Sequence, residues 1–283
     1  MDRWSVQLGN KTWWTDHMMS YDWKKQSGLA KFTLPWFDDI DRRFLEGAKL
    51  FSTADNPFQK LMGVDTLKGK RVLEIGCGMG FHSELMARAG AQLAAIDLSP
   101  TSVEATRKRF ELKGLQGDIR QMDAEAMEFP DDRFDLVWSW GVIHHSSRTG
   151  RIMRGIERVL APGGEARIMV YNMGGMPAYV TIATRYLLGF WFGKVLDELL
   201  WRSTDGFSAR FYSADLLQDQ LSTFFDEVEI TTLGQAADVV PLPRIVRPPI
   251  LKLIPLKKQR EIARARGAYL FAVAKKTGSQ NRP

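Results

Sequence analysis

The stretch Arg71-Val-Leu-Glu-Ile-Gly-Cys-Gly-Met-Gly80 decides the fold of this chain. A short apolar strand pattern runs into glycines at 76, 78 and 80, and Leu93-Ala-Ala-Ile-Asp-Leu98 supplies a second strand pattern after a helix-length gap. Glycines let the backbone turn sharply beside a ligand, and Asp97 stands where an acidic side chain can accept the hydroxyls of a ribose. The motif predicts an adenosine-containing cofactor on a doubly wound α/β sheet.

The glycine spacing discriminates between cofactors. A dinucleotide-binding turn has the form G-x-G-x-x-G, but counting from Gly76 puts Phe81 at the third glycine position. The pattern E-x-G-x-G-x-G that begins at Glu74 resembles motif I of the class I S-adenosylmethionine-dependent methyltransferases. That cofactor carries a positive sulfonium and no phosphate, so an acidic residue near the loop is tolerable where a pyrophosphate would be repelled.

The resemblance continues downstream in the order of the family. Residues 118–124 are similar to a third strand that ends at the adenine site, and 129–139 resemble the "FPD-x-x-FD-x-V" signature of small-molecule methyltransferases. Residues 158–164 match the "R-x-L-x-P-G-G" turn, which leads into a fifth strand at 165–171. The resemblance therefore covers about a hundred residues and implies this family's fold and cofactor.

Segments with the hydrophobic periodicity of strands alternate with segments that have the periodicity of helices, and this alternation predicts the layout of the sheet. Strand patterns lie at 71–75, 92–97, 117–122, 134–139, 165–171, 225–232 and 267–275, and helical patterns near 81–89, 100–113, 148–160 and from Ser213. Alternating strands and helices imply parallel pairing with right-handed crossovers. The resemblance implies a Rossmann-like, seven-stranded, mostly parallel sheet with helices on both faces and an antiparallel last strand.

Several segments lie outside the minimal fold. The expected division is an N-terminal aromatic cap (1–68), a cofactor-binding core (69–171 with 213–232 and 267–275), an apolar lid insert (172–212), a basic, proline-rich insert (233–266) and a flexible tail (276–283). Five of the nine tryptophans, Trp4, Trp13, Trp14, Trp23 and Trp36, fall in the cap. They suit either a lid over the cofactor or a helix held to the sheet by buried indoles.

The resemblance assigns cofactor contacts position by position. They are Glu74, Gly76, Cys77, Gly78 and Gly80 in motif I, Asp97 and Leu98 at the ribose, Asp123 and Ala124 at the adenine, and Ser139 and Trp140 after the fourth strand. An acid at a strand end can also cap the next helix. Ser99, followed by Pro100, is already a cap for the helix after Asp97, which leaves Asp97 for the ligand. No metal site is expected.

Catalytic and acceptor contacts are expected beyond the carboxyl ends of the strands. Residues 139–142 read Ser-Trp-Gly-Val instead of the proline-bearing tetrad of nucleic-acid amino-methyltransferases, so a nucleic-acid acceptor is disfavoured and a small molecule favoured. His144 and His145 are candidate general bases, with packing beside the cofactor as the alternative role. Acceptor contacts are predicted for Trp13, Trp14, Tyr21, Tyr171 and Tyr186.

The positive charge of the chain is local. Residues 233–266 hold eight basic and two acidic residues, an excess equal to the net charge of +6 of the whole chain. Residues 244–266 could contact an anionic membrane, attract an acidic substrate, or form an exposed arm whose charges are merely solvated. Five prolines between 241 and 255 argue against a continuous amphipathic helix before residue 256.

Composition agrees with one enzyme-sized chain of 283 residues and 45% apolar content. The single cysteine, Cys77, excludes an internal disulfide and favours the cytoplasm, with peripheral membrane contact as an option. The most apolar segment, 186–201, is interrupted by charges and is not expected to span a membrane. The predicted function is methyl transfer from S-adenosylmethionine to the oxygen, nitrogen or carbon of a small, apolar or lipid-like acceptor. The alternatives are a non-catalytic membrane-associated protein and an NAD-dependent dehydrogenase.

Overall fold

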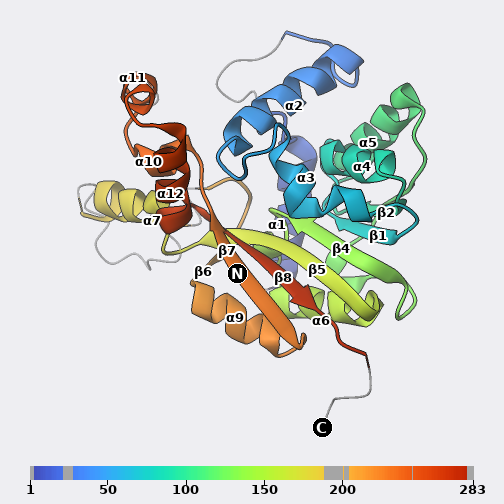
Figure 1. Cartoon of the computed structure of the whole chain (residues 1–283). Helices are drawn as coiled ribbons and strands as arrows, with labels where there is room; N and C mark the ends of the chain where they lie inside the picture. The colour runs from blue at the N-terminus through green and yellow to red at the C-terminus, as the bar shows by residue number, and fades with distance from the viewer. Residues whose placement is uncertain (1–2, 22–27, 188–199, 201–203, 244, 279–283) are drawn as a thin grey trace.

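A mostly parallel sheet runs through the centre of the molecule (Figure 1). The computed structural model describes residues 3–21, 28–187, 200, 204–243 and 245–278. The strands are β1 Arg71–Ile75, β2 Gln92–Asp97, β3 Asp118–Gln121, β4 Phe134–Trp140, β5 Leu160–Asn172, β6 Phe211–Tyr212, β7 Glu227–Leu233 and β8 Tyr269–Lys275. Their order is β3-β2-β1-β4-β5-β8-β7, and the two-residue β6 pairs with the end of β5.

The predicted family topology is confirmed. Strands β1 to β5 pair in parallel, whereas β8 lies between β5 and β7 and is antiparallel to both. The fifth strand begins earlier than the predicted 165, because Leu160 already pairs with Phe134 before the glycine turn. The added strand β6 was not predicted, because two residues are too short for a periodic signal.

Two apolar clusters fix the helices on opposite faces of the sheet. Alternate strand residues point to opposite faces, so Leu73 and Ile75 join one cluster while Val72 joins the other. Helices α6 (Thr149–Val159) and α9 (Ala214–Ser222) cover the first face. Helices α3 (Pro57–Met62), α4 (Phe81–Arg88) and α5 (Pro100–Lys113) cover the second, as Figure 1 shows.

Local capping explains where these helices begin. The hydroxyl of Ser99 accepts a hydrogen bond from the amide of Ser102 (3.2 Å), and Pro100 opens α5. Ser213 caps α9 in the same way, through the amide of Leu216 (3.1 Å). Both caps agree with the sequence prediction.

The N-terminal region packs both at the cavity and on one face of the sheet. Helix α1 (Arg3–Asp16) and α2 (Leu34–Ala48) lie at the carboxyl edge of the sheet, where they line the central cavity. Ala48 at the end of α2, together with Phe58, Met62 and Leu67, also belongs to the apolar cluster that contains Val72 of β1. Trp36 is buried on α2, whereas Trp23 and the side chain of Trp4 lie outside the described residues.

The remaining helices lie together at one end of the sheet, on the left of Figure 1. Helix α7 (Met176–Thr181) follows β5 and continues into a π-helical turn, Ile182–Leu187. The basic insert forms α10 (Ala236–Val239), α11 (Arg247–Lys252) and α12 (Leu256–Arg266), so the first long helix starts after the last proline, as predicted. Most of 186–201 lies outside the described residues, and no described helix is both long and apolar enough to cross a bilayer.

Candidate functional site

The glycine loop after β1 turns under the end of β2. The amides of Gly76 and Cys77 both donate to the carbonyl of Ile96, at 2.7 and 3.2 Å, so the loop is held against β2. Gly76, Gly78 and Gly80 all have positive φ, which favours glycine. A Cβ atom at Gly78 would meet nothing within 4 Å, whereas one at Gly76 would lie 2.1 Å from Cγ2 of Val142. Gly78 therefore faces open space, and Gly76 allows close packing.

Asp97 is fixed in position by the loop that it faces. Its Oδ2 accepts a hydrogen bond from the amide of Gly78 (3.0 Å) and its Oδ1 one from the amide of Ser99 (2.9 Å). Burial raises the pKa of Asp97, although these backbone hydrogen bonds act in the opposite direction. Each carboxylate oxygen has a further lone pair, so Asp97 can still accept the hydroxyls of a ribose.

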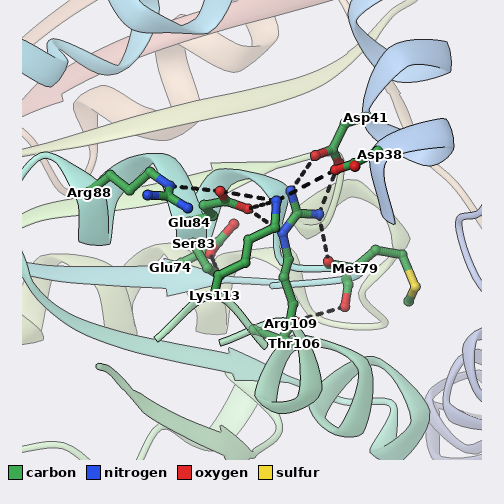
Figure 2. Close-up of polar contacts among 11 residues, drawn as sticks. Asp38, Asp41, Glu74, Met79, Ser83, Glu84, Arg88, Thr106, Arg109 and Lys113 are labelled. Carbon is green, nitrogen blue, oxygen red and sulfur yellow. Dashed lines mark hydrogen bonds and ion pairs between the residues drawn. The ribbon is translucent and has the colours of Figure 1, made fainter. Parts of the chain in front are cut away.

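A buried ion-pair network supports the outer side of the loop (Figure 2). Arg109 of α5 is 1% exposed and donates to both carboxylate oxygens of Asp41 on α2, to Glu84 on α4 (2.7 Å) and to the carbonyl of Met79 (3.2 Å). The hydroxyl of Thr106 donates to the carbonyl of Gly78 (3.0 Å). The network therefore joins α2, α4 and α5 to the backbone of the glycine loop.

Glu74 is buried and does not line the cavity at the carboxyl ends of the strands. It is 1% exposed and accepts a hydrogen bond from the hydroxyl of Ser83 in the first turn of α4. Burial raises the pKa of Glu74 to about 8. At neutral pH it is therefore largely protonated, and it links β1 to α4.

One cavity of about 390 Å³ opens above the loop at the carboxyl ends of the strands. This size lies in the range of small-molecule sites. Three carboxylates, Asp97, Asp123 and Asp205, line it, whereas the described lining residues include one guanidinium, Arg43. Arg43 is itself paired with Asp39 (2.7 Å). The acidic lining suits a cationic sulfonium cofactor and would repel the pyrophosphate of a dinucleotide.

The predicted adenine side is covered by α1. Asp123 follows β3 and caps the short helix η2 (Ala124–Ala126) through the amide of Glu125 (2.8 Å). The same oxygen accepts a hydrogen bond from the side-chain amide of Gln7 on α1 (2.9 Å). Asn10, one helical turn further, donates to the carbonyl of His145 (2.6 Å). These contacts place α1 across the carboxyl edge of the sheet.

The two adjacent histidines have different environments. His145 lines the cavity, and its Nδ1 donates to the carbonyl of Ser208 (2.6 Å), which leaves Nε2 as the ring nitrogen with a lone pair. Burial lowers the pKa of His145 to about 4, so the ring is neutral at pH 7. His144 is fully buried behind it, does not line the cavity, and packs on Tyr171 with ring centroids 4.0 Å apart.

Aromatic side chains form the wall on the side of His145. Trp14 of α1 meets the His145 ring edge to face at 5.1 Å, and Tyr171 meets it at 5.6 Å. Tyr171 pairs with Tyr269 across the β5–β8 ladder, with ring centroids 6.1 Å apart. Trp140 completes this wall. An apolar acceptor would be shielded from water here.

The structure gathers most of the predicted site residues around the cavity. Those that line it are Gly76, Cys77, Gly78, Asp97, Leu98, Asp123, Ala124, Trp140, His145, Trp14, Tyr21 and Tyr171. Glu74, Gly80, Ser139, His144 and Trp13 do not, and Trp13 stacks on His17 at 4.1 Å. Tyr186 belongs to the π-helical turn, and its side chain lies outside the described part of the chain.

Sequence reasoning missed several lining residues. His82 lines the cavity and accepts a hydrogen bond from the indole N–H of Trp138 (3.2 Å); its signal was a scarce residue type directly after motif I. Tyr269 could have been found from the expected pairing of the last strand with the fifth. Gln235 and Asp205 come from inserts and carry no motif.

This geometry defines the class of protein. Residues 73–168 match the family described as a methyltransferase domain. This part of the chain is therefore a methyltransferase domain of the class I S-adenosylmethionine-dependent family, whose cofactor is S-adenosylmethionine.

The particular relatives cover only part of the chain. Ubiquinone biosynthesis O-methyltransferases from Stutzerimonas stutzeri and Xanthomonas euvesicatoria are 34% and 40% identical over 126 and 108 residues, which are 44% and 38% of this chain. The matches cover 54% and 45% of those proteins, so the chain spans about half the length of the curated relatives it matches.

Solved structures share the fold over a longer span. An S-adenosylmethionine-dependent methyltransferase from Mesorhizobium loti has a TM-score of 0.52 at 19% identity and covers 77% of this chain and 96% of its own. A phosphoethanolamine N-methyltransferase from Haemonchus contortus, in complex with S-adenosylhomocysteine, has a TM-score of 0.54 at 16% identity and covers 88% and 61%.

Proposed function

We propose that this chain transfers a methyl group from S-adenosylmethionine to a small, apolar or lipid-like acceptor. The observation that carries the proposal is the single cavity that joins the Gly76–Gly78 turn and Asp97 to an aromatic wall around His145. The first part suits an adenosine carrying a sulfonium, and the second suits an apolar acceptor. The curated relatives are named as O-methyltransferases, which favours an oxygen atom as the methyl acceptor.

The side chains of the cavity take different parts in this proposal. Asp97 and Asp123 would hold the ribose and adenine, and Gly78 would let the cofactor approach the backbone. When bound, S-adenosylmethionine supplies an activated methyl group. His145 would accept the proton of the acceptor hydroxyl at Nε2, held in orientation by its Nδ1 bond to Ser208. Because burial disfavours the imidazolium, this proton transfer is expected to accompany methyl transfer rather than precede it.

Cofactor binding is tested by thermal-shift titration with S-adenosylmethionine and S-adenosylhomocysteine. Wild type is expected to show a saturable rise in melting temperature. Asp97→Asn should lose most of this rise, whereas Asp118→Asn, at the exposed start of β3 and paired with Arg120, should keep it. A wild type that responds to nicotinamide nucleotides instead would overturn the proposal.

Turnover is tested by release of S-adenosylhomocysteine with lipophilic phenols, alcohols and amines as acceptors. Phenols are expected to react fastest, because a phenolic proton is the easiest of these to transfer to a neutral imidazole. A chain that binds the cofactor but turns over none of the acceptors would favour the non-catalytic alternative. We place this reaction in the cytoplasm, in keeping with the single cysteine.

A further inference from the structure

Exposed apolar side chains gather on one short segment outside the cavity. Ile245 and Leu253 are the two most exposed large apolar residues of the described chain, at 86% and 83%. Leu242, Val246 and Leu256 on the same segment are also exposed. We call residues 242–258, without Arg244, the arm. Exposed apolar residues that gather in this way mark an interaction surface rather than a typical free surface.

The inner side of the arm is already packed. Ile250, Leu251 and Ile254 pack against a buried cluster that contains Leu50 and Val240. The side-chain amide of Gln259 donates to the carbonyls of Leu251 and Ile254, both at 2.8 Å, and fixes the turn between α11 and α12. The arm is therefore fastened to the body of the protein by its inner side, while its outer apolar residues are exposed.

Positive charge surrounds the outer apolar residues. Lys252, Lys257 and Lys258 are exposed beside Leu253 and Leu256. Glu261 is the one acidic residue among positions 245–266, and it pairs with Lys258 at 3.0 Å. Lys252 and Lys257 have no carboxylate partner in the described chain. Exposed apolar side chains beside free ammonium groups suit the surface of an anionic bilayer, where charged phosphates lie above the apolar acyl chains.

We propose that the arm docks on the surface of an anionic phospholipid bilayer. Ile245 and Leu253 enter the interface, and the three lysines meet the lipid phosphates. A protein partner fits less well, because lysine is depleted in protein interfaces. Attraction of an acidic substrate fits less well too, because the cavity beside the arm is lined by three carboxylates.

The arm is anchored next to the cavity. Gln235 forms the N-cap of α10, at the start of the insert, and also lines the cavity. Tyr269, which lines the cavity as well, opens β8 directly after α12. A docked arm therefore brings the cavity wall close to the bilayer. If the proposed methyltransferase function holds, a lipophilic acceptor could pass from the bilayer to the cavity.

The test is co-sedimentation of the full chain with vesicles of phosphatidylcholine alone or with 30% phosphatidylglycerol. The wild type is expected to bind the anionic vesicles and to be released by salt. Replacing Lys252, Lys257 and Lys258 by glutamine should weaken binding by about fivefold per charge. Ile245→Ser with Leu253→Ser should weaken it by roughly tenfold while leaving the salt dependence in place. In Leu253→Cys labelled with a polarity-sensitive dye, the emission of the dye should shift to the blue when anionic vesicles are added.

A matched control places the same three lysine changes elsewhere: Lys31→Gln, Lys60→Gln and Lys68→Gln, all at exposed positions. If the control lost as much vesicle binding as the lysine variant, binding would depend on the net charge of the chain alone, and the proposal would be overturned. Sedimentation without vesicles that depends on Ile245 and Leu253 would replace the bilayer with a second copy of the chain. The thermal response to S-adenosylhomocysteine should be unchanged in every variant, so failure of docking and failure of the cofactor proposal are separately visible.

Discussion

Asp41→Asn tests whether the Arg109 network stabilises the fold and shapes the cofactor loop. Asp41 is 16% exposed at its side chain and accepts two hydrogen bonds from Arg109, which is itself 1% exposed. Asparagine keeps the shape and one acceptor but removes the negative charge. Because Glu84 still pairs with Arg109, the guanidinium does not become an isolated buried charge.

The expected change in the free energy of unfolding combines the loss of the charged contact, which destabilises, with the relief of desolvation at Asp41, which stabilises. Removing one partner of a buried ion pair costs about 3–5 kcal/mol, and a hydrogen bond to a charged group contributes about 1.5–3 kcal/mol. Burial raises the pKa of Asp41 in spite of Arg109, so its carboxylate is partly desolvated and asparagine is relieved of that cost. We expect a loss of about 2 kcal/mol in the free energy of unfolding, which is roughly 5 °C in Tm for a chain of this size.

The assay is urea unfolding of the wild type, Asp41→Asn and Asp38→Asn. Asp38 lies on the same helix, but its side chain is 68% exposed and stands 3.8 Å from Lys113, so its replacement should cost less than about 0.5 kcal/mol. Arg109 also donates to the carbonyl of Met79, so Asp41→Asn should weaken S-adenosylhomocysteine binding severalfold. Equal stability and equal affinity of the two variants would refute this account of the network.

Three further predictions concern the loop, the pH dependence of stability and the base. Gly76→Ala should lower the free energy of unfolding in urea by about 3 kcal/mol, because strain at positive φ adds to the close contact with Val142. Gly78→Ala should cost about 1 kcal/mol and mainly abolish the cofactor-induced thermal shift. A larger loss of stability in Gly78→Ala than in Gly76→Ala would contradict this geometry. The ion pairs lower the pKa of Glu84 from its usual 4.5 to about 2, so its contribution to stability is present above pH 4.5 and is lost as the pH falls toward 2. Glu84→Gln should therefore flatten the plot of unfolding free energy against pH between 2 and 4.5. A plot for the variant that runs parallel to that of the wild type would disprove this role of Glu84. His145→Asn keeps a donor for the carbonyl of Ser208 but removes Nε2, so kcat with a phenolic acceptor should fall at least a hundredfold at unchanged cofactor affinity. Because the pKa of His145 is about 4, the wild-type kcat should not show a histidine step between pH 5 and 8. Near-normal turnover of the variant would exclude His145 as the base.

The sequence predicted the glycine loop and the carboxylate beside it well, because local rules control them. The turn after β1 needs glycines at positive φ, and a carboxylate at the end of β2 faces that turn whatever lies elsewhere in the chain. The parallel pairing was predicted from the alternation of strand and helix patterns, and the antiparallel last strand from the family resemblance. Element ends shifted by a few residues, as at Leu160, where pairing with Phe134 overrides the local turn signal.

The side of the cavity around His145 was predicted less completely, because long-range packing forms it. Nothing near His144 and His145 in the sequence distinguishes the buried ring from the one that lines the cavity; that difference arises from Ser208 and Trp14, which arrive from distant segments. Trp13 and Trp14 are adjacent and both are aromatic, yet the helical rotation between them directs only Trp14 to the cavity. Asp205 and Gln235 belong to inserts whose position depends on the completed sheet.

The antiparallel strand β8 has a consequence for the order of folding. It occupies an interior place between β5 and β7, so β7 cannot join the sheet until residues 269–275 have been synthesised and inserted. The pairings of β1 with β2 and with β4 lie within residues 71–140 and can form earlier. Pairings with such large sequence separation form slowly, so the wall that contains Tyr171 and Tyr269 should be the last part of the cavity to assemble. Until then the apolar edge of β5 is exposed, and chaperone dependence should be greatest in that interval.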